Sequence, residues 1–190
     1  MERRKFIKGV SISTIGLAAL GTDVFSKSAV EISNLTNGGG GFEDFMSDES
    51  MYHHLVYFQY LYKNRRKHFF EYELHQRFFE QFSSEPRPPS AFLKEKFEKQ
   101  FGSFEGFKRI FTQKALEQDE PSWLAVIQSG NLLEIKTTNE NLSQNAIILL
   151  DLWEHSYYLD YQDNIEKYVE NFWKALDWQQ IEKGLKGVKT

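Results

Sequence analysis

The chain has 190 residues, which suits one domain or two small ones, and its 41% hydrophobic residues allow a sizeable core. Its formal net charge of -4 argues against a nucleic-acid-binding protein, whose contact surface is usually basic. The sequence contains no cysteine, which excludes disulfides, thiolate zinc sites, iron–sulfur clusters and cysteine nucleophiles. A transition metal would therefore have to be held by histidine and carboxylate side chains.

The first residues have the pattern of an export signal. Arg3 and Arg4 form a twin-arginine pair, and a weakly apolar stretch follows from Gly9 to Leu20. That stretch is shorter than the about 20 residues of a membrane-spanning helix, so no stable membrane span is expected. We therefore expect residues 1–28 to be a twin-arginine signal peptide and the protein to be periplasmic or extracellular.

A helical hairpin is predicted after a linker. Residues 29–41 end in a run of glycines and are expected to form a flexible linker. Ser47, followed by two acidic residues, is typical of a capped helix start and predicts a helix to about residue 62. A second helix is predicted over residues 67–82. The two helices would form an N-terminal helical hairpin domain at residues 42–85.

Prolines at 86, 88 and 89 break the chain, and a C-terminal α+β metal-binding domain is expected at residues 90–186. Its phenylalanine stripes predict two helices with buried faces, and apolar runs around a Gly-Asn turn predict a strand hairpin. The expected elements are helices at 91–100 and 104–116, strands at 123–127, 132–137 and 146–150, and helices at 164–176 and 178–185. The predicted fold class is therefore α+β, with an N-terminal α-hairpin and a small three-stranded antiparallel sheet flanked by helices.

The densest group of reactive side chains begins at Asp151, in the sequence DLWEHSYYL. Asp151 and His155 are four residues apart, and on a helix this spacing places both side chains on one face. The pair is therefore a candidate half of a metal site. The alternative is an ordinary surface or capping pair.

The run D-x-W-E-H-x-Y-Y from Asp151 to Tyr158 resembles the metal-binding signature of iron/manganese superoxide dismutases. A more general resemblance to this family covers residues 42–183. It implies a homodimeric enzyme that holds one Fe or Mn ion per subunit. Such an enzyme converts superoxide to hydrogen peroxide and dioxygen.

The resemblance implies three histidine ligands and one aspartate ligand. Asp151 and His155 match the signature directly, and His75 matches the histidine of the second hairpin helix. On the first helix His54 matches without gaps, and one deletion would move the match to His53. A turn halfway along the 21 residues between His54 and His75 would leave arms of about 15 Å, which would bring both imidazoles to similar heights.

Other positions of the family pattern are altered. Tyr62 matches the family's catalytic gateway tyrosine, but Glu71 and Glu140 stand where the family has a glutamine beside the metal-bound solvent. Phe58 stands where the family has a supporting histidine. These changes leave an alternative function open: a divergent, dismutase-like metal-binding protein with little or no dismutase activity.

The predicted hairpin turn carries the basic run RRKH at residues 65–68. Because superoxide is an anion, this run has two interpretations: a local patch that steers superoxide toward the site, or a solvated turn.

Overall fold

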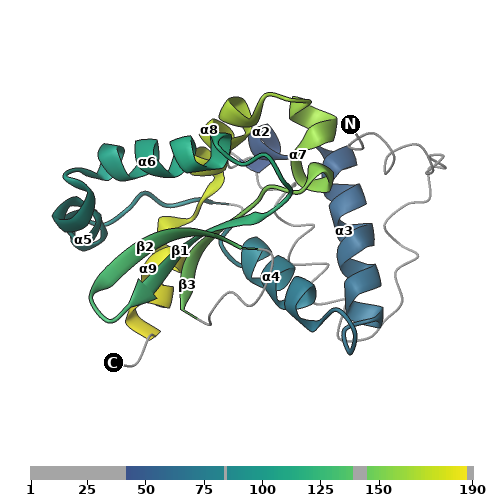
Figure 1. Cartoon of the computed structure of the whole chain (residues 1–190), viewed down its shortest axis with the longest axis horizontal. Coiled ribbons are helices and arrows are strands. Elements are labelled where there is room, and N and C mark those ends of the chain that lie inside the picture. The colour runs from purple at the N-terminus through teal and green to yellow at the C-terminus, as the bar shows by residue number, and fades with distance from the viewer. Residues whose placement is uncertain (1–41, 84, 139–144, 188–190) are drawn as a thin grey trace.

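The structure is a computed structural model that describes residues 42–83, 85–138 and 145–187 (Figure 1). The predicted signal peptide at 1–28, the linker at 29–41 and Glu140 lie outside the described residues. The helices are α2 (Phe42–Phe45), α3 (Asp48–Lys63), α4 (Phe69–Phe79), α5 (Ala91–Phe101), α6 (Phe104–Leu116), α7 (Glu154–Tyr161), α8 (Ile165–Ala175) and α9 (Trp178–Gly187). The strands are β1 (Trp123–Ser129), β2 (Leu132–Thr138) and β3 (Ala146–Asp151).

Helices α3 and α4 form the predicted hairpin. The Ser47 hydroxyl accepts a hydrogen bond from the main-chain N–H of Ser50 and so caps α3. Helix α4 is shorter than expected, because the carbonyl of Asn64 accepts hydrogen bonds from the N–H groups of Lys67 and His68. These bonds close the connection into a turn, so the second helix begins only at Phe69.

The sheet has the strand order β2-β1-β3, and both strand pairs are antiparallel, which confirms the predicted fold class. Gly130 adopts a φ of 59° at the tip of the β1–β2 hairpin, a conformation that glycine accepts without strain. In the register of β1 with β3, Trp123 lies opposite Asp151. The first residue of β1 is therefore adjacent to the first residue of the predicted signature.

The hairpin and the C-terminal region share one hydrophobic core. Every residue of β3 is buried, and both α4 and α9 pack against this strand. At the end of α4, the Gln81 side-chain amide donates to the carbonyl of Leu149 at 2.8 Å and accepts from its N–H at 2.6 Å. This amide fixes the hairpin to β3, while the division into domains at 42–85 and 90–186 stays a prediction.

The short helix α2 was not predicted, and α7 begins only at Glu154, so it does not include Asp151. Within the described residues, no helix combines the length and the apolar character that a bilayer-crossing segment requires.

Candidate metal centre

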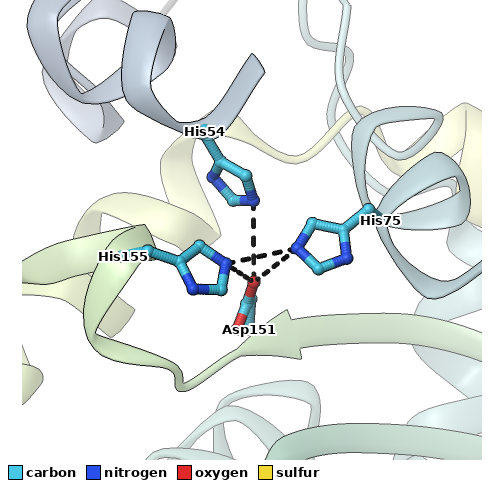
Figure 2. Close-up of side chains that lie close together, drawn as sticks. All are labelled: His54, His75, Asp151 and His155. Atoms are coloured by element: carbon cyan, nitrogen blue, oxygen red, sulfur yellow. Dashed lines mark hydrogen bonds and ion pairs between the residues drawn. The ribbon is translucent and has the colours of Figure 1, made fainter. Parts of the chain in front are cut away.

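Four side chains from separate elements converge on one point (Figure 2). They are His54 of α3, His75 of α4, Asp151 of β3 and His155 of α7, and one potential ligand atom from each lies within 4.8 Å of all the others. These are the four residues predicted as metal ligands. The structure brings His54 into the cluster, whereas His53 is half-buried and its ring contacts Tyr52.

Asp151 and His155 meet across a strand-to-helix turn. Asp151 is the last residue of β3 and His155 lies in the first turn of α7, so the expectation that one helix carries both residues is wrong. The chain changes direction between them because Oδ1 of Asp151 accepts a hydrogen bond from the N–H of Trp153 at 2.9 Å. Tyr168 donates its hydroxyl hydrogen bond to the carbonyl of Asp151, also at 2.9 Å. The turn therefore directs Oδ2 of Asp151 toward the histidines.

The imidazole of His75 is oriented by the backbone of its own helix. Its Nδ1 lies 2.6 Å from the carbonyl oxygen of Glu71. A carbonyl can only accept a hydrogen bond, so Nδ1 carries the proton and the neutral ring has its lone pair on Nε2. This Nε2 faces the cluster, 3.2 Å from Nε2 of His155. Such a contact between a histidine N–H and a backbone carbonyl is common for metal-binding histidines.

The distances place the carboxylate at the centre of the cluster. Oδ2 of Asp151 lies 3.1 Å from Nε2 of His155, 3.5 Å from Nε2 of His75 and 3.6 Å from Nε2 of His54. Figure 2 shows the three rings pointing at this oxygen from three sides. The cluster thus combines three nitrogen donors with one hard oxygen donor.

Burial sets the protonation of the cluster. It lowers the pKa of His54 well below its usual value, and the charges of His155 and His75 lower it further against the opposing effect of Asp151. Burial also lowers the pKa of His75 to about 4, although Asp151 opposes this shift. Burial would raise the pKa of Asp151, but the three neighbouring histidines, His155 foremost, lower it to about 2. At neutral pH His54 and His75 are therefore uncharged and Asp151 is ionised, as metal binding requires.

The unsatisfied atoms fit a cation. Both ring nitrogens of His54 and Oδ2 of Asp151 are buried without a hydrogen-bond partner among the described residues. Buried polar atoms left in this state are destabilising. A cation held by Nε2 of His54 and Oδ2 of Asp151 would satisfy one atom of each residue. The mixed nitrogen and oxygen donor set suits Fe, Mn or Zn.

Aromatic side chains enclose the cluster on its inner side. The ring centroid of Trp123 lies 5.1 Å from that of His75, and Phe78 and Phe79 lie 5.5 and 4.9 Å from His54. The His155 side chain is 12% exposed, whereas the other three ligand candidates are at most 2% exposed. Solvent therefore approaches the cluster from the side of His155.

Tyr57 covers this open side, and the sequence analysis missed it. Its ring centroid lies 4.7 Å from that of His155 and 5.3 Å from that of His75. Burial raises the pKa of Tyr57 to about 12, with a further contribution from Asp151, so its phenol stays protonated at neutral pH. The signal for this residue was its spacing, since Tyr57 follows His54 by three residues and so lies on the same face of α3.

The other predicted site residues lie further from the centre. Tyr62 is eight residues beyond His54 on α3, with its ring against Tyr72 and under the Arg65 guanidinium. Its gateway role stays a prediction. The side chain of Glu71 is exposed, and its main-chain carbonyl accepts the hydrogen bond from His75.

Comparison with known proteins identifies the relationship. Residues 89–184 match the family described as "Iron/manganese superoxide dismutases, C-terminal domain". The chain belongs to the iron/manganese superoxide dismutase family. The matched range contains Asp151 and His155, whereas the hairpin residues His54 and His75 precede it.

Curated relatives agree with this family. A protein of Methanothermobacter thermautotrophicus named "Superoxide dismutase [Fe]" is 34% identical over 102 residues, which are 50% of each chain. A Bacteroides fragilis protein of the same name is 35% identical over 119 residues, 58% of this chain and 62% of the relative. A Listeria monocytogenes protein named "Superoxide dismutase [Mn]" is 31% identical over 106 residues, 53% of this chain and 52% of the relative. The chain thus spans about half the length of the curated relatives it matches. Their names specify iron or manganese, and the cluster described above is a group that could hold such an ion.

Proposed function

We propose that the protein is a superoxide dismutase that holds one Fe or Mn ion per subunit through His54, His75, Asp151 and His155. The observation that carries this proposal is the convergence of four potential ligand atoms within 4.8 Å. Two of the four residues belong to the range that matches the family and two do not. The hairpin therefore supports the proposal independently of the matched range.

The residues of the cluster suit this reaction. A bound Fe or Mn ion would supply the one-electron chemistry that oxidises one superoxide and reduces another. Asp151, ionised and buried, would offset part of the positive charge of the ion. Its Oδ1 accepts a hydrogen bond from the N–H of Trp153, which leaves Oδ2 to bind the ion. The aromatic wall of Trp123, Phe78 and Phe79 would exclude water from the inner side. The protonated phenol of Tyr57 would stand at the open side, where an anion has to enter.

A second candidate is a divergent relative that binds metal with little or no dismutase activity. Phe58 is buried at the position where the family has a supporting histidine, and its ring lies 6.3 Å from that of His75. A phenyl ring offers no hydrogen bond, so this change removes a polar group that would tune the metal. Glu71 stands at one of the two positions where the family has a glutamine, and its side chain is exposed.

Metal analysis combined with a superoxide-removal assay distinguishes the two candidates. The purified chain would be loaded with Fe and with Mn in separate preparations, and the metal content and the rate of superoxide loss would be measured. One ion per chain with metal-dependent turnover supports the dismutase. One ion per chain without turnover supports the divergent relative, and a chain that binds neither ion contradicts both.

We also propose that the protein is an exported homodimer. Trp153 is 39% exposed and Glu154 half-buried beside the cluster, so this surface is available to a second subunit. Light scattering of the purified protein would give its mass in solution, and fractionation of cells that express the full chain would locate it.

A further inference from the structure

The outer end of the hairpin carries a concentrated positive charge. Lys63, Arg65, Arg66 and Lys67 fall within five consecutive residues, in a chain whose formal net charge is -4. Figure 1 shows this connection between α3 and α4 at the edge of the molecule, away from the sheet. All four side chains are exposed. We call residues 63–70 the hairpin tip.

These charges are not neutralised locally. Within the part of the chain that the structure describes, no carboxylate forms an ion pair with Lys63, Arg66 or Lys67. Arg65 donates from its guanidinium to the carbonyl of Tyr62 at 3.1 Å and lies 4.5 Å over the Tyr62 ring. A hollow of about 400 Å³ is lined by residues 63–67 alone. The five residues that line it are Asn64 and four cations, whose charged ends can contact a phosphate group.

Large aromatic rings are exposed beside these cations. Phe69 and Phe70, the first two residues of α4, are 53% and 50% exposed, with ring centroids 5.7 Å apart. Tyr60 is 51% exposed, and its ring lies 5.7 Å from that of His68. Neighbouring apolar rings exposed next to cations are unusual unless they contact a partner. This combination is typical of segments that lie at the interface of a membrane.

Helix α5 provides an internal contrast. Phe92 is 52% exposed there, with Lys96 and Lys99 on the same helix. However, Glu95 interrupts the cations and pairs with Lys99 at 2.8 Å. Among the residues that the structure describes, an exposed phenylalanine with nearby lysines therefore occurs in both places, but only the hairpin tip combines it with a run of cations that contains no acid.

We propose that the hairpin tip docks reversibly on an anionic lipid bilayer. The cations contact the lipid phosphates, and Phe69 and Phe70 enter the headgroup layer. A lipid surface fits better than an acidic protein, because the tip is the protruding end of a hairpin and a planar surface can meet the cations and both rings together. Each cation near an anionic surface contributes about fivefold to partitioning. The proposal concerns residues 63–70, none of which belongs to the metal cluster, and it does not depend on the proposed dismutase activity.

Vesicle binding of the full chain tests the proposal. Sedimentation would be measured with phosphatidylcholine vesicles and with mixed phosphatidylcholine and phosphatidylglycerol vesicles. The variant Lys63→Ser/Arg66→Ser/Lys67→Ser should bind the anionic vesicles about 100-fold more weakly, at about fivefold per cation. Arg65 is kept because it stacks on Tyr62. The control Lys94→Ser/Lys96→Ser/Lys99→Ser should bind as the parent does, and equal losses in both variants would contradict the proposal.

A second measurement localises the contact, since the N-terminal basic segment could itself attract vesicles. The chain has no cysteine, so a single introduced cysteine can carry one fluorophore. With anionic vesicles that contain a lipid-borne quencher, a label at Phe70→Cys should be quenched and a label at Phe92→Cys should not. Equal quenching at both positions, or none at Phe70→Cys, would overturn the proposal. So would binding of the parent to an acidic polypeptide but not to the vesicles.

Discussion

The hairpin and the C-terminal region each supply two members of the cluster, and they position them by different means. Asp151 and His155 lie within one turn, which is fixed by hydrogen bonds that Asp151 accepts from Trp153 and Tyr168. His54 and His75 lie on two helices whose placement depends on packing against α7 and β3. The complete cluster therefore forms only when the hairpin docks on the sheet. The contrast shows how half of a site can be evident in a sequence while the other half depends on tertiary structure.

Removal of one ligand from each region is expected to have the largest effect. His75→Ala in the hairpin and His155→Ala in the C-terminal region should each reduce the bound Fe or Mn from one ion per chain to almost none. Even outer contacts of a metal ligand change affinity by about 10- to 100-fold, so loss of a ligand should exceed that range. Metal analysis of the purified variants, with circular dichroism as a check of folding, measures this.

His53→Ala is the matched control, because His53 neighbours His54 but its ring contacts Tyr52 instead of the cluster. It should retain the full metal content. Normal metal content in His75→Ala would show that His75 is not a metal ligand.

Metal removal should destabilise the hairpin more than the sheet. A ligand present at 1,000 times its dissociation constant stabilises the folded state by about 4 kcal/mol. For a chain of this size, that corresponds to a fall in Tm of about 8–16 °C after chelation. Hydrogen exchange should show the greatest loss of protection in α3 and α4. Uniform loss across α3, α4 and β1 would indicate that the two regions open as one unit.

Acid should weaken the metal-free protein through His75. The pKa of this residue is about 4 in the folded protein, lowered chiefly by burial, and about 6.5 in an unfolded chain. Between these values the unfolded chain binds more protons, so stability is complete above pH 6.5 and falls as the pH decreases toward 4. The loss from His75 alone should be about 3 kcal/mol. Urea unfolding of the chelated protein across this range measures it, and His75→Gln should show a smaller slope.

Much of the fold could be predicted from local patterns. The expected helix at 104–116 coincides with α6, because Ser103 caps it and its phenylalanines repeat at helical spacing. The three strands were found within one or two residues, since continuous apolar runs and a Gly-Asn turn delimit them. The beginning of α4 was not found, because the carbonyl of Asn64 captures two N–H groups in a turn that apolar spacing does not reveal.

The candidate metal centre could also be predicted only in part. All four members of the cluster were named from the sequence, but its strand-to-helix turn was mistaken for a helix because the spacing of four residues suits both arrangements. The family resemblance does not mark Tyr57, because its gateway position falls on Tyr62. The position of Tyr57 itself, one helical turn from His54, was the physical signal.

A comparison of two tyrosines on α3 would sharpen the account of the open side. Tyr57→Phe removes the hydroxyl and keeps the ring, whose centroid lies 4.7 Å from that of His155, so metal content should be unchanged. Loss of one hydrogen bond to an entering anion should weaken azide binding and lower kcat/KM by up to about tenfold. Tyr62→Phe, with its ring against Tyr72, should have a smaller effect. The reverse order would assign the open side to Tyr62.

The smallest expected effect concerns the link between the two regions. The carboxylate of Asp160 in α7 accepts hydrogen bonds from the N–H of Ser47 at 2.9 Å and from its hydroxyl at 2.6 Å. Because Ser47 caps α3, these exposed bonds join the start of the hairpin to the helix that carries His155. Asp160→Ala should therefore destabilise the protein by only about 1 kcal/mol, but it should selectively increase hydrogen exchange at the start of α3.

Asp163→Ala is the control for this prediction. It removes a nearby exposed carboxylate without a hydrogen-bond partner among the described residues, and it should leave that exchange unchanged. Equal exchange in both variants would show that packing alone docks the hairpin.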